Sequence, residues 1–417
     1  MNDHSPRTTG SRVPDDAPDD APEEALYDAL AAAPDDRIVY DLSGIERRYR
    51  RLRHELPDVA VRFALKACPV DEVIEHLARL GAGADAASPR ELAQARRAGV
   101  PADLTHYGNT VKSDQDIADA HRLGIRTFAT DNSEDLAAIA AHAPGARVYC
   151  RLATSGAGAL WGLSHKFGCP PGDAVRLLTA AGDLGLVPAG LSVHVGSQQM
   201  TADAWSEALD LLATTLTELL RRGIAPDHIN LGGGLPALGC LDRYGNPLDP
   251  PLDKIFAVLR EGVGRLRRIH GGPLAFVMEP GRHLVADSGA VRARVVRLAR
   301  RRAPDGRVRH WLYLSCGKFN GLYESDALQY RLRFPTHPGG ERIPAVVAGP
   351  TCDSDDAWDH DDRALVAVPR ALASGDPVWV LSSGAYATSY LTQGFNGFAP
   401  LPHSCVAGTG RTAADHR

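Results

Sequence analysis

Eight short apolar segments alternate with amphipathic stretches between residues 61 and 279 of this 417-residue chain. Each segment ends at or just before a polar or glycine-rich stretch, and the residues between them have the apolar spacing of helices. Eight such strand–helix units predict a (β/α)8 barrel, with reactive groups at the C-terminal ends of the strands. We expect strands at residues 61–66, 83–87, 104–108, 126–130, 147–152, 191–195, 228–231 and 274–279, and helices at 71–80, 89–98 and 203–222, among others.

The pattern changes after residue 282. Short β-rich runs separated by turn clusters predict a second, mostly antiparallel β domain, and an early strand at 38–42 is expected to join it. Ser43 resembles the N-cap of a helix that runs to about residue 55. The predicted organisation is an acidic tail (1–25), a strand segment that joins the C-terminal domain (26–42), a barrel domain (43–285), a β domain (286–403) and a flexible tail (404–417), with β-domain strands at 290–298, 310–316, 345–349, 364–368 and 377–381.

Charge and cysteine usage exclude several classes of function. The net charge is −5, and residues 1–25 alone account for −5, so the rest of the chain is close to neutral. A neutral body argues against nucleic acid or a membrane as a partner. The Pro- and Asp-rich tail lacks apolar periodicity and is expected to be disordered. No apolar run reaches the ~18 residues of a spanning helix. Seven irregularly spaced cysteines without a CxxC pair indicate neither a disulfide framework nor a metal site, and they favour the cytoplasm.

Lys66 ends the first barrel strand, in a chain with only five lysines. Lysine, unlike arginine, condenses with an aldehyde. Apolar neighbours are expected to lower the pKa of this amine and to make it reactive. The alternative is a lysine whose stem packs at a strand end while its amine reaches water.

Other polar groups follow the later strands. Asp85, Asn109, Arg151 and His194 fall at or near strand ends. His194 could stack on a flat ring, with the turn at Ser197 next to a phosphate, although a single histidine is more often structural.

The last two barrel strands end in further candidate groups. The triplet Gly232–Gly234 exposes backbone N–H groups at a position where such barrels often bind phosphate, unless it is simply a flexible loop. Glu279 can pair with a protonated pyridine nitrogen, and Arg282 with a phosphate, unless the two residues take part in a salt bridge that closes the barrel.

The predicted β domain adds a thiol and aromatic groups. Cys352 precedes a run of acids, which raise the pKa of a thiol and favour a group that can donate a proton. The same acids could attract a cationic substrate, or form a solvated loop. Tyr386 follows a glycine turn and could reach a phosphate, and Phe395 could line a substrate channel, although both could equally be packing residues. An amine, a partner for a ring nitrogen, a stacking group and several phosphate donors together describe a site for pyridoxal phosphate.

These motifs, in this order, resemble the fold-type III pyridoxal-phosphate decarboxylases, the group of ornithine and diaminopimelate decarboxylases, over roughly residues 35–400. The resemblance implies the alanine-racemase-like barrel and β domain, and Lys66 as the residue that holds the cofactor. It implies that Cys352 returns a proton after CO2 leaves, from the neighbouring subunit of a homodimer. Glu91 resembles a further supporting residue. The implied cofactor-binding set is Lys66, Asp85, Arg151, His194, Ser197, Gly233, Gly234, Glu279, Gly281, Arg282 and Tyr386.

The resemblance also suggests a substrate. Asp353 matches an aspartate that receives the distal ammonium in ornithine-type enzymes, and the segment at Phe395 resembles that type too. Residues 317–326 resemble a bacterial branch instead, where Glu324 and Asp326 are both candidates for the substrate-binding acid. The favoured reaction is L-ornithine to putrescine, in polyamine biosynthesis. Lysine, diaminopimelate or another diamino acid remain alternative substrates. A racemase is less favoured because Cys352 and Asp353 have no evident role there.

Overall fold

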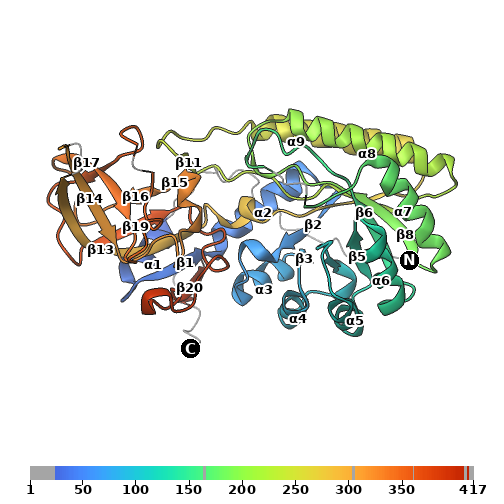
Figure 1. Cartoon of the computed structure of the whole chain (residues 1–417), viewed down its shortest axis with the longest axis horizontal. Coiled ribbons are helices and arrows are strands. Elements are labelled where there is room, and N and C mark those ends of the chain that lie inside the picture. The colour runs from blue at the N-terminus through green and yellow to red at the C-terminus, as the bar shows by residue number, and fades with distance from the viewer. Residues whose placement is uncertain (1–23, 163–165, 303–305, 360, 408–410, 413–417) are drawn as a thin grey trace, which may run out of the picture.

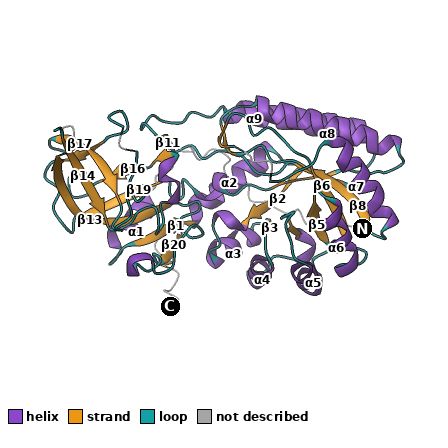
Figure 2. Cartoon of the chain, viewed as in Figure 1, coloured by secondary structure: helices purple, strands orange, loops and turns teal. Residues whose placement is uncertain are grey.

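The computed structural model describes residues 24–162, 166–302, 306–359, 361–407 and 411–412. It contains a barrel surrounded by helices and, beside it, a domain built mainly of strands (Figure 1). The strands of the second domain lie together at one end of the elongated molecule, and the longest helices cover the barrel at the other end (Figure 2). The chain therefore consists of an α/β barrel domain and a β domain.

Eight parallel strands of the described chain close the barrel, in the spatial order β10-β12-β2-β3-β4-β5-β6-β8. This confirms the predicted barrel, and each strand lies within a few residues of its expected place. Alternate residues of each strand face inward, so the outward residues pack under the helices. The strands are β2 (Val59–Ala64), β3 (Gly83–Ala86), β4 (Thr105–Tyr107), β5 (Thr127–Thr130), β6 (Arg147–Arg151), β8 (Val187–Ser192), β10 (His228–Asn230) and β12 (Ala275–Met278).

Some helices of the barrel domain begin at side chains that cap them. Ser88 accepts a hydrogen bond from the Glu91 backbone N–H at the start of α4, which also has a proline in its first turn. The helix after the early strand is capped by Asp41, whose carboxylate accepts from the Ser43 N–H at 2.9 Å; the prediction of Ser43 as the cap was therefore wrong. The helices are α2 (Leu42–Glu55), α3 (Asp71–Arg79), α4 (Pro89–Arg97), α5 (Asp114–Arg122), α6 (Ser133–His142), α7 (Pro171–Asp183), α8 (Asp203–Arg221), α9 (Leu252–His270) and α10 (Arg282–Val285).

The β domain is organised around the long strand β13 (Gly289–Arg302). This strand pairs antiparallel with β1 (Arg37–Asp41), β14 (Val308–Leu314) and β19 (Pro377–Leu381). The pairs β1–β20 and β14–β17 are parallel, and the others in this sheet are antiparallel. The predicted mostly antiparallel domain and the joining of the early strand are both confirmed. The remaining strands are β16 (Arg331–Arg333), β17 (Arg342–Ala348), β18 (Val366–Pro369), β20 (His403–Ala407) and β21 (Arg411–Thr412), and two small ribbons are formed by β7 (Ala159–Trp161) with β9 (Ser197–Gln199) and by β11 (Leu241–Asp242) with β15 (Leu328–Gln329).

The ends of the chain differ from the expectation. Residues 24–32 form helix α1 (Glu24–Ala32), not a tail followed by a strand, because Leu26 and Leu30 bury an apolar face against Val39 and Trp379. Strand β20 extends to Ala407, so part of the expected flexible tail is paired with β1. The rest of both predicted tails, at 1–23, 408–410 and 413–417, lies outside the described residues.

Lys66 lies just beyond β2 in a short 3-10 helix, Leu65–Ala67, rather than in the strand itself. The backbone N–H of Tyr386, from the β domain, donates to the carbonyl oxygen of Ala67 at 2.6 Å. The β domain thus fixes the turn that carries the lysine. Within the described residues, no helix is both long and apolar enough to span a membrane.

Candidate functional site

One cavity at the C-terminal end of the barrel brings together nine of the predicted site residues. Its wall includes side chains and glycines from the ends of β2, β8, β10 and β12, and one residue of the β domain. This is the position at which (β/α)8 barrels place their reactive groups. The lining residues are Ala64, Lys66, His194, Ser197, Gly233, Gly234, Leu235, Glu279, Gly281, Arg282 and Tyr386.

The amine of Lys66 lies among acidic groups. Lys66 is exposed through the open cavity, although the surrounding protein atoms still favour the neutral amine; Asp85, Tyr386 and Glu279 outweigh this effect and raise the pKa of Lys66. The expectation of a lowered pKa was therefore wrong, because the carboxylates come from strands far away in sequence. Asp85 fits because residue 108 is a glycine, where any Cβ would collide with the Asp85 carboxylate. Lys66 is therefore an ammonium ion in the protein as it stands.

Two further predicted residues lie close to this cavity without lining it. Arg151 stacks on Phe167, 4.9 Å from the ring centre, and its charge acts on the carboxyl groups of Asp85 and Glu279. Glu91 accepts a hydrogen bond from the Ala87 N–H at 2.6 Å, which fixes the loop after β3. Both positions suit residues that support the groups lining the cavity.

Glu279 is held by Asn230, which sequence reasoning missed. The Asn230 amide donates to Glu279, and its oxygen accepts from the Gly232 N–H at 2.8 Å. Asn230 thereby joins the carboxylate to the glycine triplet. Burial, with a smaller contribution from Asp85, raises the pKa of Glu279 to about 8. A polar residue inside the last apolar strand before the triplet was the available sequence signal.

Glu279 gives a testable pH dependence of stability. Its pKa rises from 4.5 unfolded to about 8 folded, so between these values the folded cofactor-free protein retains a proton that the unfolded chain has lost. Stability must then fall as the pH rises through this window. We expect Glu279→Gln to flatten the fall in unfolding free energy between pH 5 and pH 8, measured by urea titration. Parallel curves for the two proteins would contradict this assignment.

His194 faces the glycine triplet. Its Nδ1 accepts from the Gly233 N–H at 3.2 Å, and burial, together with Arg151 and Lys66, lowers its pKa well below the usual value. The imidazole is therefore neutral. A Cβ on residue 233 would lie 2.8 Å from the Glu279 carbonyl oxygen, and Gly234 has φ of +124°. Only glycine leaves this cradle open, next to a flat uncharged ring.

Arg282 forms a buried bidentate ion pair with Glu324, with N–O distances of 2.7 and 2.6 Å. Its guanidinium lies between the rings of Trp161 and Tyr386, 4.3 and 4.9 Å from their centres, and it donates to the Ser197 hydroxyl at 3.3 Å. The salt bridge between Glu279 and Arg282 that was weighed from the sequence is absent from the described contacts. Trp161 carried no sequence signal.

The two acids weighed from sequence have different positions. Glu324 is buried beside Arg282 at the mouth. The side chain of Asp326 is 61% exposed and pairs instead with Lys318. Glu324 is therefore the candidate acid that the fold brings to the cavity.

Cys352, Asp353 and Phe395 do not line the cavity of their own chain. Cys352 is exposed, and its backbone N–H donates to the side-chain oxygen of Asn396 at 2.8 Å. Phe395 packs on Phe319, with ring centres 4.9 Å apart. These residues form a separate surface cluster on the β domain.

Two of the acidic residues after Cys352 stabilise the conformation of their own loop. Asp356 is buried and accepts from the backbone N–H groups of Lys318 and Thr351 at 2.7 and 3.0 Å. Asp355 binds the Lys318 amine at 2.9 Å. For Asp355 and Asp356 these contacts support a structural role in the loop over a role in substrate binding.

A row of tyrosines leads from the cavity to the surface of the β domain. Tyr386 stacks on Tyr390 at 5.0 Å, and Tyr390 contacts Tyr323 at 4.8 Å. Tyr323 and Tyr390 are about half exposed. The mouth therefore continues onto an aromatic surface of the β domain.

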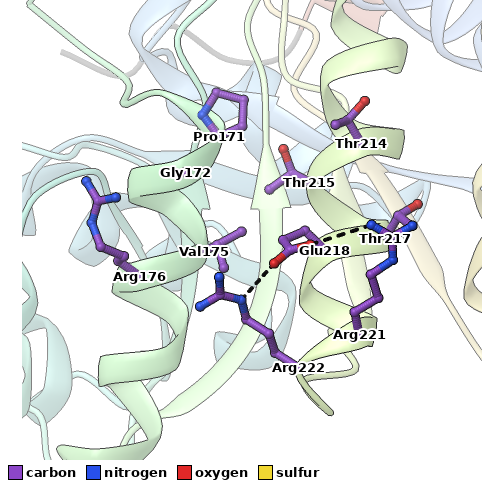
Figure 3. Close-up of a pocket in the computed structure, with 10 residues that line it drawn as sticks. All are labelled: Pro171, Gly172, Val175, Arg176, Thr214, Thr215, Thr217, Glu218, Arg221 and Arg222. Carbon is purple, nitrogen blue, oxygen red and sulfur yellow. Dashed lines mark hydrogen bonds and ion pairs between the residues drawn. The ribbon is translucent and has the colours of Figure 1, made fainter.

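A larger cavity, of about 710 Å³, lies on the outside of the barrel between α7 and α8 (Figure 3). Its arginines have acidic neighbours: Arg222 contacts Glu218 at 2.9 Å, and Arg176 pairs with Asp173. It contains none of the strand-end groups. Among the described residues no cluster of metal-ligating side chains is found either.

The cavity at the barrel mouth fits pyridoxal phosphate. An amine and the flat neutral ring of His194 line one cavity with a protonatable carboxyl group, and the glycine cradle and Arg282 can hold a phosphate. Fold and site thus define a pyridoxal-phosphate enzyme with a barrel and a β domain. Residues 42–286 match the pyridoxal-binding domain of the pyridoxal-dependent decarboxylases. The chain belongs to this family of decarboxylases.

Relatives extend the match to both domains. Lysine/ornithine decarboxylase of Selenomonas ruminantium is 30% identical, over 88% of this chain and 89% of that protein. Ornithine decarboxylase of Schizosaccharomyces pombe is 29% identical, over 88% and 82%. The solved structure of lysine/ornithine decarboxylase from Vibrio vulnificus, complexed with cadaverine, is 29% identical with a TM-score of 0.79, covering 93% of this chain and 98% of that chain. These likenesses confirm the family inferred from the motifs.

Proposed function

We propose that this chain decarboxylates a basic L-amino acid, with the conversion of L-ornithine to putrescine as the favoured reaction. The observation that carries the proposal is the single cavity in which Lys66, His194, Glu279 and Arg282 converge. Relatives named for ornithine and lysine decarboxylation support the substrate class. Putrescine formation would place the enzyme in polyamine biosynthesis, and seven free cysteines support a cytoplasmic location.

The roles of the lining residues follow from their positions. Pyridoxal phosphate, when bound, supplies an electron-poor ring that takes up the electron pair left as CO2 departs. Lys66 would hold the cofactor through its amine, once the ammonium has given up a proton. Glu279 would hold the proton of the ring nitrogen, and His194 would cover one ring face. The phosphate would be bound by Gly233, Gly234, Ser197, Arg282 and Tyr386, with Gly281 beside them, and Asp85 and Arg151 would adjust the charge of the lysine and the carboxylate.

The proton donor is assigned to a second copy of the chain. Cys352 is exposed and does not line the cavity of its own barrel, so a homodimer would bring it to the neighbouring mouth. The exposed rings of Tyr323, Tyr390 and Phe395 supply an apolar surface for such a contact. In this arrangement the thiol returns a proton to Cα after CO2 has left.

Substrate choice is assigned to two acids. Asp353, next to the thiol, would meet the distal ammonium from the partner side, and Glu324 would lie on the barrel side. Phe395 would form part of the channel wall. Asp326 contributes less in this proposal, because it is exposed and paired with Lys318.

A panel of substrates tests this assignment. In a CO2-release assay we expect ornithine or lysine to give the highest kcat/KM, above arginine and diaminopimelate. Asp353→Asn should raise KM for the preferred substrate about tenfold or more, because a charge-assisted contact is lost. Glu341→Gln, at an exposed acid of the same domain, is the matched control. Activity on diaminopimelate alone would overturn the role of Asp353.

A further inference from the structure

A layer of polar side chains fills the inside of the barrel below the cavity. Arg62, His106, Tyr149 and His228 come from β2, β4, β6 and β10, which are alternate strands of the barrel. They are exposed by only 7%, 5%, 1% and 6%. Barrel layers are built from four side chains of alternate strands, and these are mostly Val, Ile and Leu. Here the same positions hold a guanidinium, two imidazoles and a phenol.

Several polar atoms of this layer lack hydrogen-bond partners. Arg62 Nε, His106 Nδ1 and His228 Nε2 are buried without a partner in the described chain, and the Tyr149 hydroxyl has only Asn230 within reach. The three rings lie next to each other, with centres 5.4 to 5.6 Å apart. Buried polar groups are normally satisfied, by protein or by a bound species. Three buried polar atoms without partners in one layer therefore favour a bound species at this place.

The charge of Arg62 narrows the choice of ligand. Other buried cations have carboxylate partners, as Lys112 has Asp135 and Arg282 has Glu324. No ion pair of Arg62 is found among the described residues, and Asp103 and Glu279 act on it only through space. An arginine is almost never buried without a counter-ion. Water would satisfy its hydrogen bonds but would supply no negative charge in contact with it.

Glycines leave room for the side chains of two members of this layer: a Cβ on residue 83 would lie 2.6 Å from Arg62 Cδ, and one on residue 190 would lie 2.8 Å from His228 Cε1. His228 Nδ1 is 3.5 Å from Asp227, which lines a cavity of about 520 Å³ on the floor together with Arg267.

We propose that the floor of the barrel binds a small monovalent inorganic anion of the chloride type at Arg62. The guanidinium supplies the compensating charge, and the Tyr149 hydroxyl and the Nδ1–H group of His106 supply neutral donors. Burial, with His228 and Arg62, keeps His106 uncharged, so the arginine is the cation that selects the anion. This site is separate from the cavity at the mouth and does not depend on which amino acid is decarboxylated.

Thermal unfolding in matched salts tests the site. At equal ionic strength, sodium chloride should raise Tm by a few degrees over sodium gluconate, with saturation, because a ligand that binds only the folded state stabilises it. Arg62→Met should abolish the difference between the salts, and Arg267→Met, at an arginine paired with Asp58 on the floor, should preserve it. Equal Tm values of the native protein in the two salts would overturn the proposal.

Crystals of the native protein soaked in bromide decide the matter even if Arg62→Met does not fold. We expect an anomalous peak within hydrogen-bond distance of the Arg62 guanidinium. Ordered water alone at that place, or bromide bound only on the outer surface, would overturn the proposal.

Discussion

Replacement of Lys66 by alanine is expected to remove the visible absorbance band of the bound cofactor and to lower decarboxylation about a thousandfold or more. The side chain projects into the cavity with Glu279, His194 and Arg282, and none of the other four lysines of the chain lines that cavity. Absorbance spectra of the purified protein and a CO2-release assay measure the two effects.

Lys254→Ala is the matched control, because that side chain is 67% exposed on α9. It should leave spectrum and rate unchanged. The fold should survive the replacement of Lys66, since the amine makes no hydrogen bond or ion pair among the described contacts, and circular dichroism can verify this. A Lys66→Ala protein that kept both the band and the rate would refute the assignment of the lysine.

The second large effect is expected from a mixture of two defective proteins. Lys66→Ala lacks the amine, and Cys352→Ala lacks the thiol that we assign to the neighbouring subunit's site. If each site takes one residue from each chain, half of the dimers in an equal mixture are mixed, and one of their two sites is intact. Activity should therefore recover to about a quarter of the native rate.

The single variants set the background for this test. Cys352→Ala alone should bind the cofactor normally and should turn over slowly or form abnormal products, because no group is placed to return the proton. Cys405→Ala, at a buried cysteine of strand β20, controls for loss of a thiol elsewhere. A mixture no more active than the sum of its two components would rule out shared sites.

The sequence predicted the barrel well because strand and helix periodicities are local properties. It also predicted which residues gather at the mouth, because strand ends of a closed barrel meet by geometry. It misjudged the pKa of Lys66, since Asp85 and Glu279 lie 19 and 213 residues further along the chain and only the fold sets their distance from the amine.

Other features had no local signal at all. The ion pair of Arg282 with Glu324 joins the two domains across 42 residues, and the sequence left Glu324 and Asp326 as equal candidates. Helix α1 was hidden by the acidic segment before it, although Leu26 and Leu30 are spaced one helical turn apart. The polar layer at Arg62 was also missed. The sequence shows a single charged residue within an apolar strand, but it does not show which residues of the other three strands lie at the same height in the barrel.

In the proposed site, the cofactor phosphate would share the Arg282 guanidinium with Glu324, which contacts both of its terminal nitrogens in this structure. The Glu324 carboxylate would then lose part of the positive charge beside it. That carboxylate then favours an incoming positive charge, and an amino acid with a distal ammonium brings one. The preference for a substrate with a basic side chain is thus expected to be strongest in the protein that already carries its cofactor.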